Sequence, residues 1–144
     1  MEWLKYLIDY GIIGLLLSMS IVSVAIGIER HLFFRKVKLA DFDCRKSLEL
    51  RLTEKMHLIA SIGSNAPYMG LLGTVLGIML TFYNMGQSGF MDTGKIMVGL
   101  ALALKVTAMG LLVAIPAVTI YNLLLRRVKV LIMQWEILDE RKGI

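Results

Sequence analysis

The chain has few of the residues that build metal sites and disulfides. Its 144 residues include one cysteine, Cys44, and two histidines, His31 and His57. A lone cysteine excludes an intrachain disulfide, and the two histidines lie far apart in charged stretches. No set of Cys, His and carboxylate side chains has the spacing of metal ligands. We therefore expect neither a metal nor any other cofactor.

Motifs of soluble enzymes are missing as well. The sequence holds no nucleophile–base pair and no carboxylate dyad. Residues 70–77, GLLGTVLG, are glycine-rich like a phosphate-binding loop. They lack the Lys-Ser/Thr ending of such a loop and lie in an apolar segment. These absences predict that the protein is not an enzyme.

Apolar residues dominate instead. They make up 57% of the chain and give a mean hydropathy of +0.70, which is too apolar for a soluble domain of this size. Three charge-poor segments approach or exceed the about 20 residues that a membrane helix needs: residues 10–28, 66–83 and 96–125. We predict an all-α integral membrane protein with one domain, residues 1–144. Its three transmembrane helices form an oligomeric bundle, and the second and third extend into the cytoplasm.

The positions of the basic residues predict the orientation. Cytoplasmic connections carry an excess of Lys and Arg. Nearly all of the 16 Lys and Arg residues fall in the helical region 29–65 or in the tail 126–144, so we place both in the cytoplasm. The N-terminus and the loop 84–95 then lie outside. The net charge of +5 reflects this orientation, and we expect no nucleic-acid partner. Three basic residues, Lys5, Lys95 and Lys105, lie outside these two cytoplasmic regions.

Local patterns predict where the helices begin and end. Apolar residues at helical spacing predict a helix from about residue 42 to residue 62. Pro67 places the start of the second span near Ala66, because proline is tolerated in the first turn of a helix. After Arg126 an apolar stripe predicts that the last helix continues into the tail. The stripe consists of Val128, Leu131, Ile132, Trp135 and Leu138.

Small residues recur on one face of the second and third spans. In lipid, such faces mark where helices approach closely, so we expect both to pack against protein. The face of the second span holds Gly70, Gly73, Thr74, Gly77 and Thr81. The face of the third span holds Gly99, Ala103, Thr107, Gly110, Ala114 and Ala117.

Each small-residue face carries a threonine near its middle, Thr74 on one and Thr107 on the other. A threonine hydroxyl can bond a carbonyl of its own helix one turn back and have no further role. Both threonines lie on a glycine-lined face, and this shared setting favours a functional role. The two interpretations, a local hydrogen bond without further role and a functional role, therefore both stay open.

Lys105 is the only charged residue of the third span, and it lies nearly opposite Thr107 on the helix. Two interpretations stay open. The lysine reaches the outer interface or faces lipid, or it is a buried cation that pairs with a carboxylate of another helix. We read Asp9 and Glu29 as interfacial charges that bracket the first span, and Pro116 as a residue that can kink the third.

Two segments resemble a known family. Residues 66–82 (APYMGLLGTVLGIMLTF) and 99–122 (GLALALKVTAMGLLVAIPAVTIYN) are similar to the two signature spans of the MotA/TolQ/ExbB proton channel family, and most like its ExbB/TolQ branch. Glu29-Arg30 after the first span also fits the family pattern. The resemblance implies a subunit of a motor in the bacterial inner membrane that is driven by the proton motive force, with a periplasmic N-terminus and a cytoplasmic C-terminus.

The resemblance also implies partners. Family members form a homopentamer whose second and third spans line a pore, and we expect the small faces to let the copies pack tightly. The pore holds an ExbD/TolR-type single-span protein that supplies a membrane aspartate. A TonB-like protein passes the energy to outer-membrane transport. The family threonines of the proton pathway fall on Thr74 and Thr107.

One departure from the family pattern concerns a carboxylate. Many ExbB and TolQ members carry a glutamate at the position of Leu102. The partner's aspartate is then the proton carrier, and Lys105 is a candidate electrostatic modulator of that acid. Two alternatives to the ExbB role stay open: a TolQ-like subunit for envelope integrity and a non-conducting membrane scaffold.

Overall fold

The computed structural model describes residues 2–89 and 91–143, and these residues form helices joined by short connections. The all-α prediction is confirmed. Three helical stretches, Glu2–Lys36, Met56–Ser88 and Thr93–Lys142, are long and apolar enough to cross a membrane. In chain order the elements are α1 (Glu2–Tyr6), the π-helical η1 (Leu7–Ile12), α2 (Ile13–Lys36), the 3₁₀ turn η2 (Leu39–Asp41), α3 (Arg45–Leu52), α4 (Met56–Ser88) and α5 (Thr93–Lys142).

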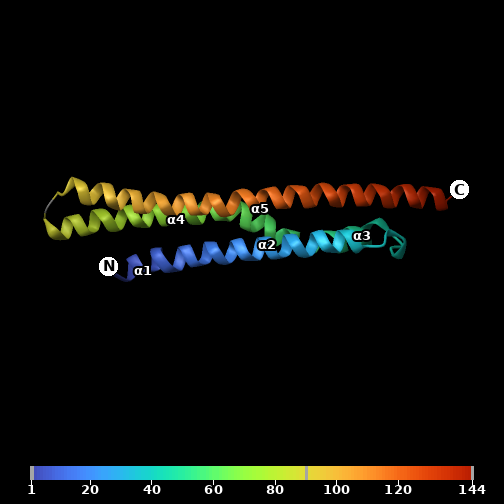
Figure 1. The fold of residues 1–144 in the computed structure, drawn as a ribbon, viewed down its shortest axis with the longest axis horizontal. Coiled ribbons are helices and arrows are strands. Elements are labelled where there is room, and N and C mark those ends of the chain that lie inside the picture. Colours follow the sequence, from blue (N-terminus) through green and yellow to red (C-terminus); the bar gives the residue numbers. More distant parts are fainter. Residues whose placement is uncertain (1, 90, 144) are drawn as a thin grey trace.

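The helices lie side by side in a long, narrow rod (Figure 1). α2 and α5 run in the same direction, and α4 runs in the opposite one. The N-terminus therefore lies at the end of the rod that holds the α4–α5 connection, and the C-terminus lies at the end that holds α3. This is the chain path expected for three consecutive spans.

α5 is the longest element, with 50 residues. At 1.5 Å per residue it is about 75 Å long, more than twice the hydrocarbon thickness of a bilayer. Its N-terminus is capped by Asp92, whose Oδ1 accepts hydrogen bonds from the backbone N–H groups of Gly94 and Lys95 at 2.9 and 3.3 Å. The expected continuation into the tail is confirmed, because the helix extends unbroken to Lys142.

The predicted helix over residues 42–62 is wrong, because the chain turns in its middle. α3 ends at Leu52, and α4 begins at Met56 after Lys55 with φ +67°. Leu48 and Leu52 before the turn, and Met56 and Ile59 after it, are all buried in one core. The helical spacing of the apolar residues was therefore real, but it is shared by two helices that pack on the same core.

The predicted start of the second span at Pro67 does not coincide with the start of a helix. α4 begins at Met56, so Pro67 lies in the helix interior, where its missing N–H leaves a carbonyl without its intrahelical partner. The green part of α4 runs obliquely before the helix aligns with α5 (Figure 1), as expected near an interior proline. α5 shows no comparable bend at Pro116.

Candidate functional site

The backbones of α4 and α5 approach each other most closely at two glycines. A Cβ atom added to Gly110 would lie 2.7 Å from the carbonyl oxygen of Ala66 and 3.0 Å from Cα of Gly70. A Cβ atom added to Gly70 would lie 3.0 Å from the carbonyl oxygen of Val106. These neighbours are backbone atoms that cannot move without shifting a helix, so the contact requires glycine at both positions.

The other small residues extend this contact along the helices. Gly73 lies against Val106, Gly77 against Ala103, and Gly99 against Thr81. Ala114 is buried further along α5. The small faces of α4 and α5 thus meet each other within one chain. A contact between copies has to use other surfaces, which differs from the expectation that these faces serve packing between copies.

Thr74 and Thr107 are brought together by this contact, and their hydroxyl groups touch. Thr74 Oγ1 lies 3.0 Å from the carbonyl oxygen of Ala103 on α5 and 3.3 Å from that of Gly70 on its own helix. Thr107 Oγ1 lies 3.4 Å from the same Gly70 oxygen. Each threonine therefore reaches the carbonyl one turn before the other threonine.

The threonine pair has more acceptors than hydrogens. A hydroxyl group has one hydrogen to donate and two lone pairs that accept. The two hydroxyls share two carbonyl oxygens and each other, so several hydrogen-bond arrangements have similar geometry. Thr74 is 7% exposed and Thr107 half-buried. The site is a partly buried hydroxyl pair that can exchange donor and acceptor roles without moving a helix.

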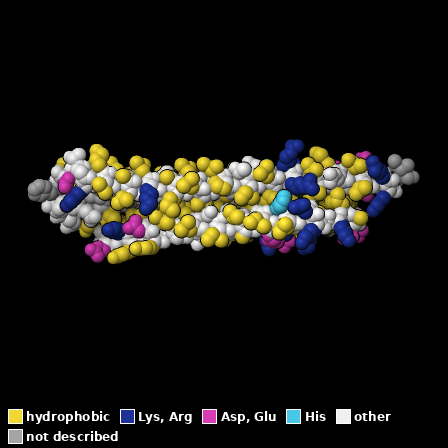
Figure 2. Space-filling view, viewed as in Figure 1, with side chains coloured by type: hydrophobic (Ala, Val, Ile, Leu, Met, Phe, Trp, Pro, Cys, Tyr) yellow, Lys and Arg dark blue, Asp and Glu magenta, His cyan; other side chains and the backbone are white. Residues whose placement is uncertain are grey.

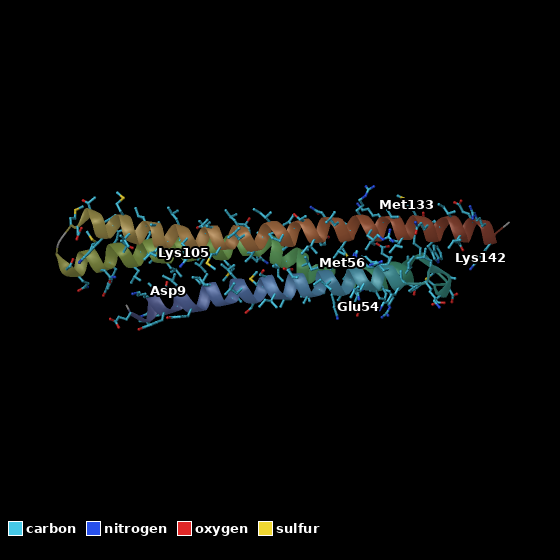
Figure 3. The ribbon with its side chains drawn as sticks, in the orientation of Figure 1. Asp9, Glu54, Met56, Lys105, Met133 and Lys142 are labelled. Atoms are coloured by element: carbon cyan, nitrogen blue, oxygen red, sulfur yellow. The ribbon has the colours of Figure 1, made fainter. Side chains whose placement is uncertain are left out.

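Lys105 is exposed on the surface of α5 (Figure 3). Its neighbours on that surface, Leu102 and Leu104, are also exposed, and the described part of the chain gives Lys105 no ion pair. Lys105 is therefore not buried within the single chain, and its pairing with a carboxylate of another helix stays a prediction for the assembly. Lys105 faces lipid or another chain.

Arg30 is a second buried polar group, and it lies near the C-terminal end of α2, next to α3. It is 4% exposed, and its Nη1 donates a 2.9 Å hydrogen bond to the carbonyl oxygen of Arg51 in the last turn of α3. A cation at a helix C-terminus satisfies a free carbonyl and the helix dipole. Glu29 pairs with Arg30 at 2.9 Å and with Lys55 at 3.2 Å. The family pattern Glu29-Arg30 was the only sequence signal for this junction.

The described residues contain no group of three or more His, Cys, Asp or Glu side chains that could hold a metal ion. The polar atoms of the threonine site are the two hydroxyl groups and the carbonyl oxygens of Gly70 and Ala103.

Relatives of known name cover nearly the whole chain. The sequence profile of the MotA/TolQ/ExbB proton channel family matches residues 24–137. The biopolymer transport protein ExbB of Aquifex aeolicus is 56% identical over 136 residues, which are 94% of this chain and 92% of that protein. The putative biopolymer transport protein ExbB-like 2 of Helicobacter pylori is 54% identical over 134 residues, 93% of this chain and 89% of that protein. A Helicobacter pylori ExbB is 49% identical over 138 residues, 96% of this chain and 95% of that protein.

Proposed function

Because the chain belongs to the MotA/TolQ/ExbB proton channel family, we propose that it is the ExbB-like subunit of a proton-driven motor in the bacterial inner membrane. With an ExbD-type partner it harnesses the proton motive force to energise TonB-dependent outer-membrane transport. The observation that carries this proposal is the contact between Thr74 and Thr107 at the closest approach of α4 and α5.

The threonine pair suits a site that receives and releases a proton beside a foreign carboxylate. The partner's membrane aspartate carries the proton, since position 102 of this chain is a leucine. Hydroxyl groups stabilise a carboxylate by donating to it, and they accept from a carboxylic acid. The hydroxyls of Thr74 and Thr107 can turn toward the partner's aspartate when it is ionised. When the aspartate is protonated, they can turn back to the carbonyl oxygens of Gly70 and Ala103.

The proposed orientation places the end with α3 in the cytoplasm and the N-terminus in the periplasm. Lys and Arg side chains gather at the end of the rod that holds α3 and the C-terminus (Figure 2). This asymmetry supports the orientation through the positive-inside rule.

The proposed assembly is a homopentamer around the partner helices. The small faces of α4 and α5 are used within the chain, so the copies pack through other surfaces. Large apolar side chains remain exposed on all three membrane-length helices and are available for contact with lipid, with the partner and with other copies.

The test is to replace both threonines with valine, which keeps the shape and removes the hydroxyls. We expect proton flux in liposomes, reconstituted with the partner, to be lost. Serine at both positions should retain flux. Thr119→Val is the matched control, because Thr119 is exposed and, within residues 2–89 and 91–143, its hydroxyl bonds only the Ile115 carbonyl of its own helix at 2.8 Å. Normal flux in the double valine variant would remove the pair from the mechanism.

Two other functions are separated by flux in liposomes together with a deletion in the cell. A TolQ-like subunit would conduct protons but serve envelope integrity, so its deletion would leave TonB-dependent uptake intact. A non-conducting scaffold would bind the partner without any flux.

A further inference from the structure

The end of the rod with the N-terminus contains two adjoining cavities that extend toward the threonine pair. The larger, of about 730 Å³, is lined by polar groups that include Lys5, Asn84, Asp92 and Lys95. The smaller, of about 190 Å³, lies between η1, α4 and α5 and is lined by Asp9, Thr81 and Ala103 among others. Both cavities are lined by Lys5, Thr81, Asn84, Gly99 and Leu102, so the two cavities adjoin.

The smaller cavity reaches most of the way from the outer surface to the threonine pair. Ala103 lies about 10 Å along α5 from residue 96, the expected outer end of the third span, at 1.5 Å per residue. The carbonyl oxygen of the same Ala103 accepts the hydrogen bond of Thr74 at 3.0 Å. One residue therefore forms the wall of the cavity and a hydrogen-bond acceptor of the threonine site.

Asp9 and Lys5 are the titratable side chains that line the smaller cavity. Asp9 is exposed, and the structure assigns its carboxylate no ion pair or hydrogen bond among the described residues. It lies in the π-helical turn η1. Turns of this type are rare in proteins as a whole, but many of those known occur at functional sites. Figure 3 shows Asp9 on the first helix at about the level of Lys105 along the rod.

We propose that Asp9 is a proton-relaying residue in the inner wall of a water-filled access path to the Thr74–Thr107 pair. Its carboxylate takes a proton from water on the outer side of the path and returns it to water nearer the threonine pair, so the residue ends each transfer unchanged. Its negative charge raises the local concentration of protons, and Lys5 in the same wall opposes this effect. The inference rests on the proposed function and names a residue of this chain in its proton path.

The first experiment tests the path without any transport assay. In a Cys44→Ser background, single cysteines at Thr81 and Leu102 are treated with a charged, membrane-impermeant thiol reagent from the outer side. We expect both to react, because they line the cavity. Leu112→Cys is the control, since Leu112 is exposed on α5 but lines neither cavity. Protection of both cavity positions, with labelling after denaturation as the reference, would overturn the proposal.

The second experiment measures proton flux in liposomes containing the full chain and its partner. Asp9→Asn should reduce flux about tenfold at low salt and less at high salt, because the effect of the charge on local proton concentration is screened. Asp9→Glu should retain flux, and Lys5→Gln should raise it. Glu2→Gln removes the same charge from α1 outside the two cavities and serves as the control.

The results separate this inference from the proposed function. If the double valine variant loses flux while Asp9→Asn keeps it, the access residue is wrong and the function stands. If the wild type shows no flux with its partner, the proposed function fails, and the labelling pattern alone decides whether the cavity is open to water.

Discussion

The middle of the rod and the end that holds α3 are stabilised in different ways. In the middle, α4 and α5 touch through glycine and alanine, and the polar contact is the threonine pair. At the α3 end, large apolar side chains such as Leu48, Leu52 and Trp135 fill the space between helices, and Trp135 Nε1 donates to the Phe42 carbonyl oxygen at 3.0 Å. The first region is built for close approach of two backbones, and the second for burial of apolar surface.

This difference separates function from stability. A close backbone contact with few large side chains leaves polar groups of two helices within hydrogen-bond distance. At the α3 end, the core of leucine, isoleucine and tryptophan holds the helices together, and polar contacts such as those of Arg30 and Trp135 fix single side chains to backbone carbonyls. We therefore expect substitutions at the α3 end to change mainly the stability, and substitutions in the middle to change mainly the activity.

The largest effect on stability is expected for Leu48→Ala. Leu48 is fully buried between α3 and the long helices, and a Leu→Ala change in such a site costs about 3 kcal/mol. Thermal unfolding in detergent, followed by circular dichroism, measures the loss, with exposed Leu50→Ala as the control. Proton flux per folded molecule should stay unchanged. A loss of flux without a loss of stability would contradict the separation of the two regions.

A smaller loss of stability, with a large loss of activity, is expected for Gly110→Ala. The added methyl group would lie 2.7 Å from the Ala66 carbonyl oxygen, and such overpacking costs about 2 kcal/mol. The helices must separate locally, which pulls Thr107 away from Thr74. Flux and thermal unfolding are compared with Gly86→Ala, where an added Cβ has no neighbour within 4 Å. Equal flux in both variants would show that the close contact is not needed for conduction.

The smallest effect is expected for Lys105→Met. In the proposed assembly, we expect the exposed cation on α5 to favour the ionised form of the partner carboxylate. Its removal lets that acid hold its proton to higher pH, so the pH at half-maximal flux should rise by up to about one unit. Lys129→Met removes the same charge from an exposed position of α5 in the tail and should leave the profile in place. An unchanged profile for Lys105→Met would assign the lysine to the lipid surface.

The sequence predicted the features that depend on composition and period. Hydropathy located three membrane-length helices, and small-residue spacing located the faces of α4 and α5 that meet. It did not reveal the turn at Lys55, because Leu48, Leu52, Met56 and Ile59 keep helical spacing across it. That turn depends on contacts distant in sequence, such as the bond from Arg30 to the Arg51 carbonyl oxygen.

The same limit applies to the site. Thr74 and Thr107 could be chosen as candidates because each lies on a small face, but their mutual contact depends on the register of two helices. The cavity beside Asp9 is formed by three elements, η1, α4 and α5, and no local pattern predicts it. A lone aspartate near a span boundary looks the same in sequence whether it faces open solvent or lines a cavity.

The unbroken length of α5 has a mechanical consequence. Gly110, where the backbones of α4 and α5 touch, divides α5 into an arm of about 25 Å toward Thr93 and one of about 48 Å toward Lys142. A stiff rod that rocks about this point acts as a lever with unequal arms. A displacement of about 1 Å at the short arm becomes about 2 Å at the far end. Because α2 and α3 share a core with the long arm, they would move with it, and the amplified displacement would reach the whole α3 end.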